Sequence, residues 1–321
     1  LPSIILKIML KYFIKRILQV IPVLLLCSII IFSLIRLIPG NPAMILAGPD
    51  ALPEQIDVMT KELGLDKPII SQYFIWISNI LMGDFGKSII NGYPVFKLIS
   101  LKFVATLELA ISGLIISLLI AFPLGILSAI KRNGIIEKFT TIFTALGQAI
   151  PTFWLGILLV LVFSIKFRWL PPSGRIEFTE NPELAFKLII LPAFTLGVYT
   201  ASVLTRFLKT SVLEILSLDY VLTARAKGLS EWIVITRHVI KNALIPFVTV
   251  LGIQFGAFLG GSVVTESIFD WPGLGRLMLQ SIHTRDYPVL QGTILVVVFG
   301  FVIVNLIIDL LYSFLDPKIR Y

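Results

Sequence analysis

The sequence predicts an all-α integral membrane protein with six transmembrane helices, and three observations support this fold class. Of the 321 residues, 57% are hydrophobic and only 14% are charged, whereas soluble domains carry roughly 25% charged residues. Six apolar runs are each long enough for a helix to cross a bilayer. The runs lack the period-two alternation of a membrane β-barrel, so helices are the predicted spanning elements.

The first apolar run follows a basic N-terminus and is longer than the core of a secretory signal, so we interpret it as a span. Met9 precedes it, and residues 1–8 are expected to be an extension from an alternative start. The third run exceeds the bilayer thickness, so we expect its ends to extend past the membrane or the helix to tilt. The predicted spans cover residues 17–38, 109–130, 139–165, 188–205, 242–265 and 287–308.

The charged segments between the spans predict the orientation of the chain. With the N-terminus inside, the inner segments carry fifteen Lys or Arg residues against five acidic ones, and the outer segments twelve against eleven. The net charge of +8 is therefore a cytoplasmic excess, and nucleic-acid binding is not expected. The resulting organisation is an inner segment 1–16, span 17–38, an outer subdomain 39–106, a membrane core 107–313 and an inner tail 314–321.

The outer subdomain, a large loop between the first two spans, contains helix signals of its own. Pro53 opens a predicted helix over 54–63 that Gly64 ends, and Asp66 is expected to cap a second helix that Gly83 ends. We favour packing of the second helix on the membrane helices over a position at the membrane interface. Its apolar face consists of Ile70, Tyr73, Phe74, Ile77, Ile80 and Leu81.

The inner loop 206–241, between spans four and five, predicts a bent helix pair. Gly228 can take a left-handed conformation and end the first helix, and Ser230 can cap the second. Small residues near the bend, Ala224 and Ala226, would allow another body to approach closely beside Arg225. An amphipathic loop resting on the membrane surface is the alternative.

Few residues are suited to chemistry. Cys27 is the only cysteine, and His238 and His283 are the only histidines, so neither a metal site nor a catalytic site is expected. Residues 86–88 read Gly-Lys-Ser like the end of a phosphate-binding loop, but Leu81 stands where that motif requires glycine. An intramembrane enzyme or a stand-alone carrier would need acidic pairs, repeats or mid-span charges that the runs lack.

The inner-loop sequence Thr223-Ala-Arg-Ala-Lys-Gly228-Leu resembles the coupling loop of permease subunits of ATP-binding-cassette importers of the dipeptide, oligopeptide and nickel class. The broader importer motif has Glu-Ala-Ala where this chain has 222–224, and a proline where it has Lys241. Nearly the whole chain resembles the first of the two paired permeases. The other matching segments are 36–42 (RLIPGNP), 83–88 (GDFGKS), 151–156 (PTFWLG), 266–275 (ESIFDWPGLG), 285–292 (RDYPVLQG) and 305–321.

The resemblance implies a prokaryotic cell-membrane protein with both termini in the cytoplasm. Its partners would be a second homologous permease, two ATP-binding subunits, an outer substrate-binding protein and membrane lipid. ATP and Mg²⁺ would be used by the ATP-binding subunits, with no cofactor bound by this chain. The implied solute is a di- or oligopeptide, with nickel or another small solute as the alternative. The implied coupling residues are Thr223, Ala224, Arg225, Ala226, Lys227, Gly228, Leu229 and Ser230.

Two further features of the spans are candidates for function. Gly252, Gly256 and Gly260 form one smooth helix face. We slightly favour packing within the chain over a seam with the second permease, and the face can also line the pathway. Glu266 lies at the outer border and is a candidate for contact with the solute pathway or the binding protein. Asp309 is expected to make structural hydrogen bonds, and Pro151 to be a static kink, with a hinge as the alternative.

Overall fold

The structure, a computed structural model, describes residues 2–37, 43–44, 52–62 and 64–315. In these ranges the regular elements are helices, and the only bridge is an isolated antiparallel one between Lys87 and Pro94. Five helices are long and apolar enough to cross a membrane, and a bent pair makes a possible sixth span. The all-α fold class is confirmed. The five long helices are α1 (Pro2–Leu37), α5 (Val95–Ile130), α8 (Pro182–Leu216), α11 (Lys241–Gly261) and α14 (Tyr287–Leu315).

The third predicted span is broken, not tilted. Helix α6 (Ile135–Ala149) is followed by α7 (Thr152–Leu159) and the π-helical segment η1 (Val160–Lys166), and the two parts meet at an angle of 103°. The break falls at Ile150 and Pro151, where the backbone is extended. Proline has no amide hydrogen and disfavours a helical residue before it, which explains the position of the break. The expectation of a mere kink was wrong.

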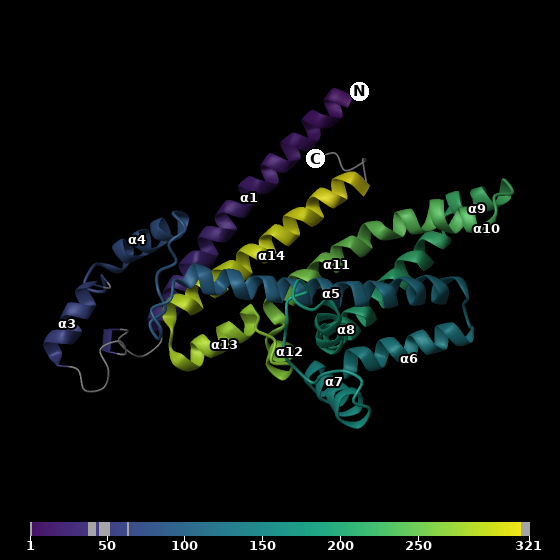
Figure 1. The fold of residues 1–321 in the computed structure, drawn as a ribbon. Coiled ribbons are helices and arrows are strands. Elements are labelled where there is room, and N and C mark those ends of the chain that lie inside the picture. Colours follow the sequence, from purple (N-terminus) through teal and green to yellow (C-terminus); the bar gives the residue numbers. More distant parts are fainter. Residues whose placement is uncertain (1, 38–42, 45–51, 63, 316–321) are drawn as a thin grey trace.

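Helix α8 forms the centre of the bundle. In its most apolar stretch 78% of the residues are buried, against 17–33% in the other four long helices. Helix α5 packs along α8 (Figure 1) at close range, because Gly197 approaches the Gly113 carbonyl and the Ser117 hydroxyl donates to the Gly197 carbonyl at 3.0 Å. Helix α5 begins at Val95, so it starts well inside the segment 39–106 that we predicted as outer subdomain.

The two helices of the predicted outer subdomain are α3 (Pro53–Glu62) and α4 (Ile69–Leu81), and left-handed Gly64 and Gly83 follow them as predicted. The expected Asp66 cap is wrong, because Pro68 occupies the cap position of α4. Only part of the predicted apolar face of α4 packs on a membrane helix. The Tyr73 hydroxyl lies 2.9 Å from the Ser28 hydroxyl on α1, whereas Ile70, Phe74 and Leu81 are exposed.

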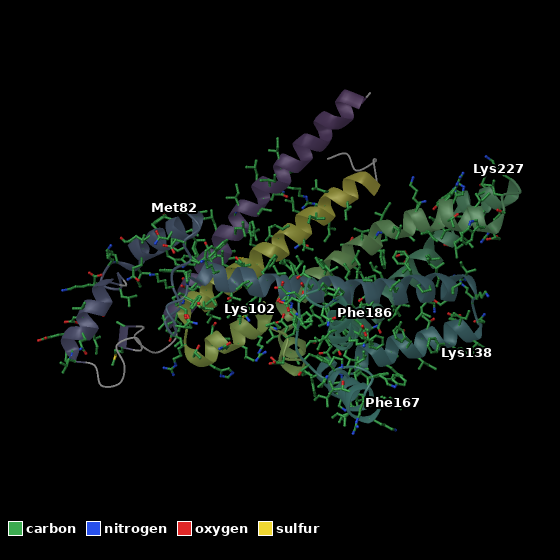
Figure 2. All side chains as sticks on the ribbon, in the orientation of Figure 1. Met82, Lys102, Lys138, Phe167, Phe186 and Lys227 are labelled. Atoms are coloured by element: carbon green, nitrogen blue, oxygen red, sulfur yellow. The ribbon has the colours of Figure 1, made fainter. Side chains whose placement is uncertain are left out.

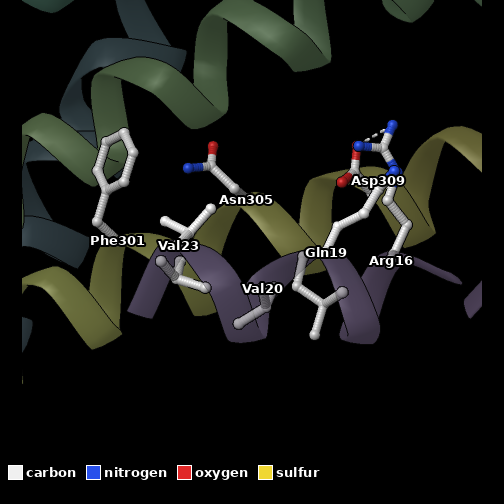
Figure 3. A pocket seen from close by; sticks show the side chains of 9 residues that line it. Arg16, Gln19, Val20, Val23, Phe301, Asn305 and Asp309 are labelled. Carbon is white, nitrogen blue, oxygen red and sulfur yellow. Dashed lines mark ion pairs between the residues drawn. The ribbon is translucent and has the colours of Figure 1, made fainter. Parts of the chain in front are cut away.

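Helices α1 and α14 lie side by side and run in opposite directions (Figure 1). A groove between them contains an ion pair from Arg16 to Asp309 at 3.3 Å (Figure 3). Asp309 was expected to make structural hydrogen bonds. In the structure it forms an ion pair with Arg16 on the first helix.

The predicted inner loop forms a helical hairpin at the end of the molecule opposite α3 and α4 (Figure 1). It consists of α9 (Asp219–Ala226), the single turn α10 (Glu231–Ile233) and the π-helical segment η2 (Val234–Ile240), which continues directly into α11. The short helices α12 (Val263–Ile268) and α13 (Leu274–Thr284) form a corner that joins α11 to α14. These two features contain most of the predicted site residues.

Candidate functional site

The hairpin turns at Gly228, as the sequence predicted. Gly228 has a φ of +78°, its amide donates to the Arg225 carbonyl at 2.9 Å, and the Leu229 amide donates to the Ala224 carbonyl at 3.4 Å. A Cβ atom at this position would meet nothing within 4 Å, so the left-handed backbone alone favours glycine here. Ser230 occupies the cap position of α10, but its side chain makes no capping hydrogen bond, so that expectation was wrong.

A bidentate ion pair crosses the turn. Arg225 donates from Nε to Glu231 Oε1 at 2.7 Å and from its Nη2 to Oε2 at 3.3 Å. Both side chains are partly exposed, so the pair fixes geometry more than it adds stability, with about 0–1 kcal/mol expected at the surface. Sequence reasoning missed Glu231, because a spacing of six residues across a turn matches no helical contact.

The base of the hairpin is fixed to the membrane helices. Val221 on α9 and Val234 on η2 are fully buried, in one cluster with Leu208 of α8. Ala224 belongs to the same cluster and is 6% exposed, so its small side chain serves packing inside the chain, not the approach of another body.

Hydrogen bonds tie the two arms of the hairpin together. The Tyr220 hydroxyl donates to the His238 carbonyl at 3.1 Å, and Asn242 Nδ2 donates to the Tyr220 hydroxyl at 2.9 Å. Packing and hydrogen bonds together make α9, η2 and the start of α11 one stiff body.

The outer surface of the hairpin combines apolar and basic side chains. Of the eight predicted coupling residues, all except Ala224 are exposed. Leu222 and Trp232 are 53% and 75% exposed and flank the basic pair Arg225 and Lys227. Lys227 stands at the tip, at the end of the molecule opposite α3 and α4 (Figure 2). Large apolar residues on a stiff polar hairpin are typical of a protein-binding surface.

The glycine face of α11 packs against α14 of the same chain. A Cβ atom on Gly252 would lie 1.5 Å from Ile308 Cδ1, one on Gly256 2.5 Å from Phe301, and one on Gly260 3.3 Å from Val297. These positions let the two helices approach closely. The glycine face therefore packs inside the chain, which is the interpretation slightly favoured from the sequence over a seam with the second permease.

Glu266 is completely buried, so the expected contact with solute or with an outer protein is wrong for this structure. Its Oε1 accepts hydrogen bonds from Thr106 Oγ1 at 2.9 Å and Ser262 Oγ at 2.7 Å. Its Oε2 accepts from the Arg276 backbone amide at 2.9 Å, in the first turn of α13. The carboxylate thus satisfies a free amide at a helix N-terminus and fastens α13 to α5.

The rest of the segment 266–275 locks the same corner. The buried Trp271 ring donates from Nε1 to the Ala105 carbonyl at 2.8 Å, and the Leu274 amide donates to Thr106 Oγ1 at 2.7 Å. Gly273 leaves the space that the Glu266 carboxylate fills, because a Cβ there would lie 2.2 Å from Oε1. The motif is therefore a structural clamp in this conformation.

Two other motifs meet just before the start of α5. The Ser88 hydroxyl donates to the Asp286 carboxylate, whose second oxygen accepts from the Ile89 amide at 3.2 Å. Both Ser88 and Asp286 are buried. Gly292 allows Phe85 and Ile99 to pack against the start of α14. This contact fastens the segment before α5 to the turn between α13 and α14, and sequence spacing offers no signal for it.

Apolar spanning helices around a central α8, with a stiff polar hairpin at one end, define a multi-pass membrane protein. Residues 121–321 match the model of the family "Binding-protein-dependent transport system inner membrane component", and residues 9–110 match the model of its N-terminal region. The chain belongs to this family and is a permease subunit of an ATP-binding-cassette importer.

Curated relatives match over the full length. The chain is 42% identical to the glutathione transport system permease protein GsiC of Escherichia coli (strain K12), over 98% of this chain and all of the relative. The corresponding protein of Salmonella paratyphi A is also 42% identical with the same coverage.

Two solved transporters share the fold at low sequence identity. The MetNI methionine ABC transporter in an inward-facing conformation matches with a TM-score of 0.56 and 17% identity, over 68% of this chain and 96% of that one. An amino acid ABC transporter crystallised with histidines matches with a TM-score of 0.51 and 15% identity, over 68% and 94% of the chains.

Proposed function

We propose that this chain forms half of the translocation pathway of an ATP-driven importer of small peptides, and that the α9–α10 hairpin couples it to the ATP-binding subunits. The observation that carries the coupling proposal is the hairpin itself, which exposes apolar and basic residues while its base is buried in the bundle. The full-length similarity to glutathione permeases favours a peptide solute, since glutathione is a tripeptide.

The mechanism follows from the stiffness of the hairpin. ATP and Mg²⁺ bind the partner ATPase subunits, and their closure moves a groove that holds the exposed side chains Leu222, Trp232 and Arg225. Because η2 continues directly into α11, this movement rotates the fifth span and its α14 neighbour. The pathway then switches between inward-facing and outward-facing states. Hydrolysis resets it, and this chain itself makes or breaks no covalent bond.

The remaining partners and the orientation belong to the same proposal. A second homologous permease completes the pathway, and an extracytoplasmic binding protein delivers the solute. The hairpin and both termini face the cytoplasm, in agreement with the fifteen Lys or Arg residues of the inner segments. Nickel or another small solute is the alternative cargo.

The test compares Gly228→Asp with Gly228→Asn in the complete reconstituted importer. Asn and Asp tolerate a left-handed backbone about equally well, so both variants carry the same strain, but only Asp adds a negative charge beside Arg225 and Lys227. We expect Gly228→Asp to lower peptide uptake per ATP hydrolysed at least tenfold, and Gly228→Asn to lower it much less. Deleting residues 225–228 should uncouple the complex completely.

Uptake of glutathione, tri-alanine and Ni²⁺ by the unmodified importer identifies the cargo. Normal co-purification of the ATPases with Gly228→Asp, together with full transport, contradicts the coupling assignment. Uptake of Ni²⁺ without uptake of either peptide contradicts the peptide assignment.

A further inference from the structure

A cavity of about 360 Å³ lies beside the start of α5, on the side that loop charges predict to be extracytoplasmic. Three parts of the chain form its walls: the first turns of α5, the segment before α8, and the turn between α12 and α13. Figure 2 labels Lys102 on α5 near α13. The lining residues are Ser100, Leu101, Lys102, Val104, Arg175, Glu177 and Pro272.

The walls of this cavity are fixed in place. Arg175 donates from Nε and Nη2 to the two oxygens of Glu108 on α5, both at 2.8 Å. This pairing raises the pKa of Arg175 above its ordinary value. The neighbouring Gly174 amide donates to the Phe269 carbonyl at 2.8 Å, which anchors the segment to the corner formed by α12 and α13. A preformed cavity of this size is in the range of small-molecule sites, about 300–1,000 Å³.

Two of the lining charges take no part in the ion pairs that the described residues form. Arg175 pairs with Glu108, and the nearby Arg276 pairs with Asp270. Lys102 and Glu177 make no ion pair with any residue in the described ranges of the chain.

The surroundings of the two groups leave them available to a ligand. Lys102 is half-buried within electrostatic range of both Arg175 and Arg276. Glu266 attracts it from inside the corner but already accepts three hydrogen bonds. Glu177 attracts the Arg175 guanidinium, which Glu108 already holds, and accepts a local hydrogen bond from Thr179 at 3.3 Å. The cavity therefore offers one ammonium group and one carboxylate.

We propose that this cavity is an entry subsite for a zwitterionic solute, in which Lys102 binds the carboxylate of a short peptide and Glu177 binds its ammonium group. The exposed Leu101 and Val104 and the half-buried Pro272 contact the peptide side chains. A bipolar site of this kind discriminates against capped peptides, because each missing charge leaves one protein charge unpaired. The inference rests on the proposed peptide transport and names where on this chain the peptide first binds.

The experiment uses cysteine protection in the complex of this chain with the second permease and the ATPases, without the binding protein. In a Cys27→Ser background, Ser100→Cys places one thiol on the cavity wall. A neutral maleimide labels it in the absence and presence of tri-alanine, or of tri-alanine that is N-acetylated and C-amidated. We expect tri-alanine to slow labelling about threefold at twice its Kd, and the capped peptide to have no effect.

Charge-neutral variants and matched controls test the two proposed contacts. Protection should disappear with Lys102→Gln or Glu177→Gln. It should persist with Lys97→Gln, an exposed lysine earlier on α5, and with Glu180→Gln, an exposed acid on the same segment as Glu177. Each variant is compared with itself, with and without peptide, so changes in thiol reactivity cancel.

The proposal is overturned if the capped peptide protects the thiol as well as tri-alanine does. It is also overturned if protection by tri-alanine persists in both Lys102→Gln and Glu177→Gln. Protection by solute-free binding protein but not by tri-alanine also overturns it, because the cavity is then a docking contact. Uptake by the complete importer separates the two proposals. Tri-alanine uptake without protection refutes only the entry subsite, whereas protection without any peptide uptake supports the subsite and refutes the proposed transport function.

Discussion

Replacing Glu266 with glutamine tests whether this buried carboxylate is a structural clamp. The carboxylate accepts three hydrogen bonds, from Thr106 and Ser262 at Oε1 and from the Arg276 amide at Oε2. A glutamine side chain has nearly the same shape but replaces one accepting oxygen with a donating NH₂ group. The substitution therefore changes hydrogen bonding with little change in packing.

Both orientations of the glutamine amide leave a conflict. If its oxygen takes the Oε1 position, the NH₂ group faces the Arg276 N–H. If the amide is reversed, the NH₂ group faces the Thr106 and Ser262 hydroxyls, which then lose the oxygen that accepts their own O–H groups. One unsatisfied buried donor costs about 1–3 kcal/mol, so we expect Glu266→Gln to destabilise the protein by about that amount.

Thermal unfolding of the purified complex in detergent measures this effect. Glu180→Gln, at an exposed glutamate, is the control and should leave the midpoint unchanged. A Glu266→Gln variant with normal thermal stability but with lost peptide uptake would falsify the structural role and restore a direct role in transport.

Two further substitutions probe close contacts between distant segments. Gly252→Ala should lower thermal stability because its Cβ would lie 1.5 Å from Ile308 Cδ1, and combining it with Ile308→Ala should recover part of the loss. Additive effects in this double-mutant cycle would contradict the direct contact. Ser88→Ala removes the donor to the buried Asp286 carboxylate, so a loss of about 1–3 kcal/mol is expected in the same thermal assay. Ser100→Ala, at an exposed hydroxyl that bonds within its own helix, is the control, and equal midpoints for the two variants would show that the Ser88 contact contributes nothing.

Local patterns sufficed for features that depend on a short stretch of chain. Apolar length identified the spanning helices, because the backbone in a bilayer is restricted to a few structures. Gly64, Gly83 and Gly228 are left-handed and follow helices, since glycine takes this conformation without steric cost. The same reasoning failed for Asp66 and Ser230, where a suitable residue is present but makes no cap.

Apolarity did not reveal the course of the third span. A continuous run such as 139–165 has the same composition whether the helix is straight or bent. Pro151 marked a weak point, but the 103° angle depends on how α6 and α7 each pack against α8. Sequence spacing likewise showed that Gly252, Gly256 and Gly260 share a face without showing which helix would cover it.

By itself, the sequence determined the membrane class, most helix positions and the bend at Gly228, because lipid and backbone sterics act on neighbouring residues. Only the tertiary structure decided the roles of the charges. Glu266 is a clamp because Thr106, 160 positions away, lies against it, and Lys102 and Glu177 share a cavity because α5 and the segment before α8 fold together. Charges respond to whatever surrounds them in space, and those surroundings come from distant parts of the chain.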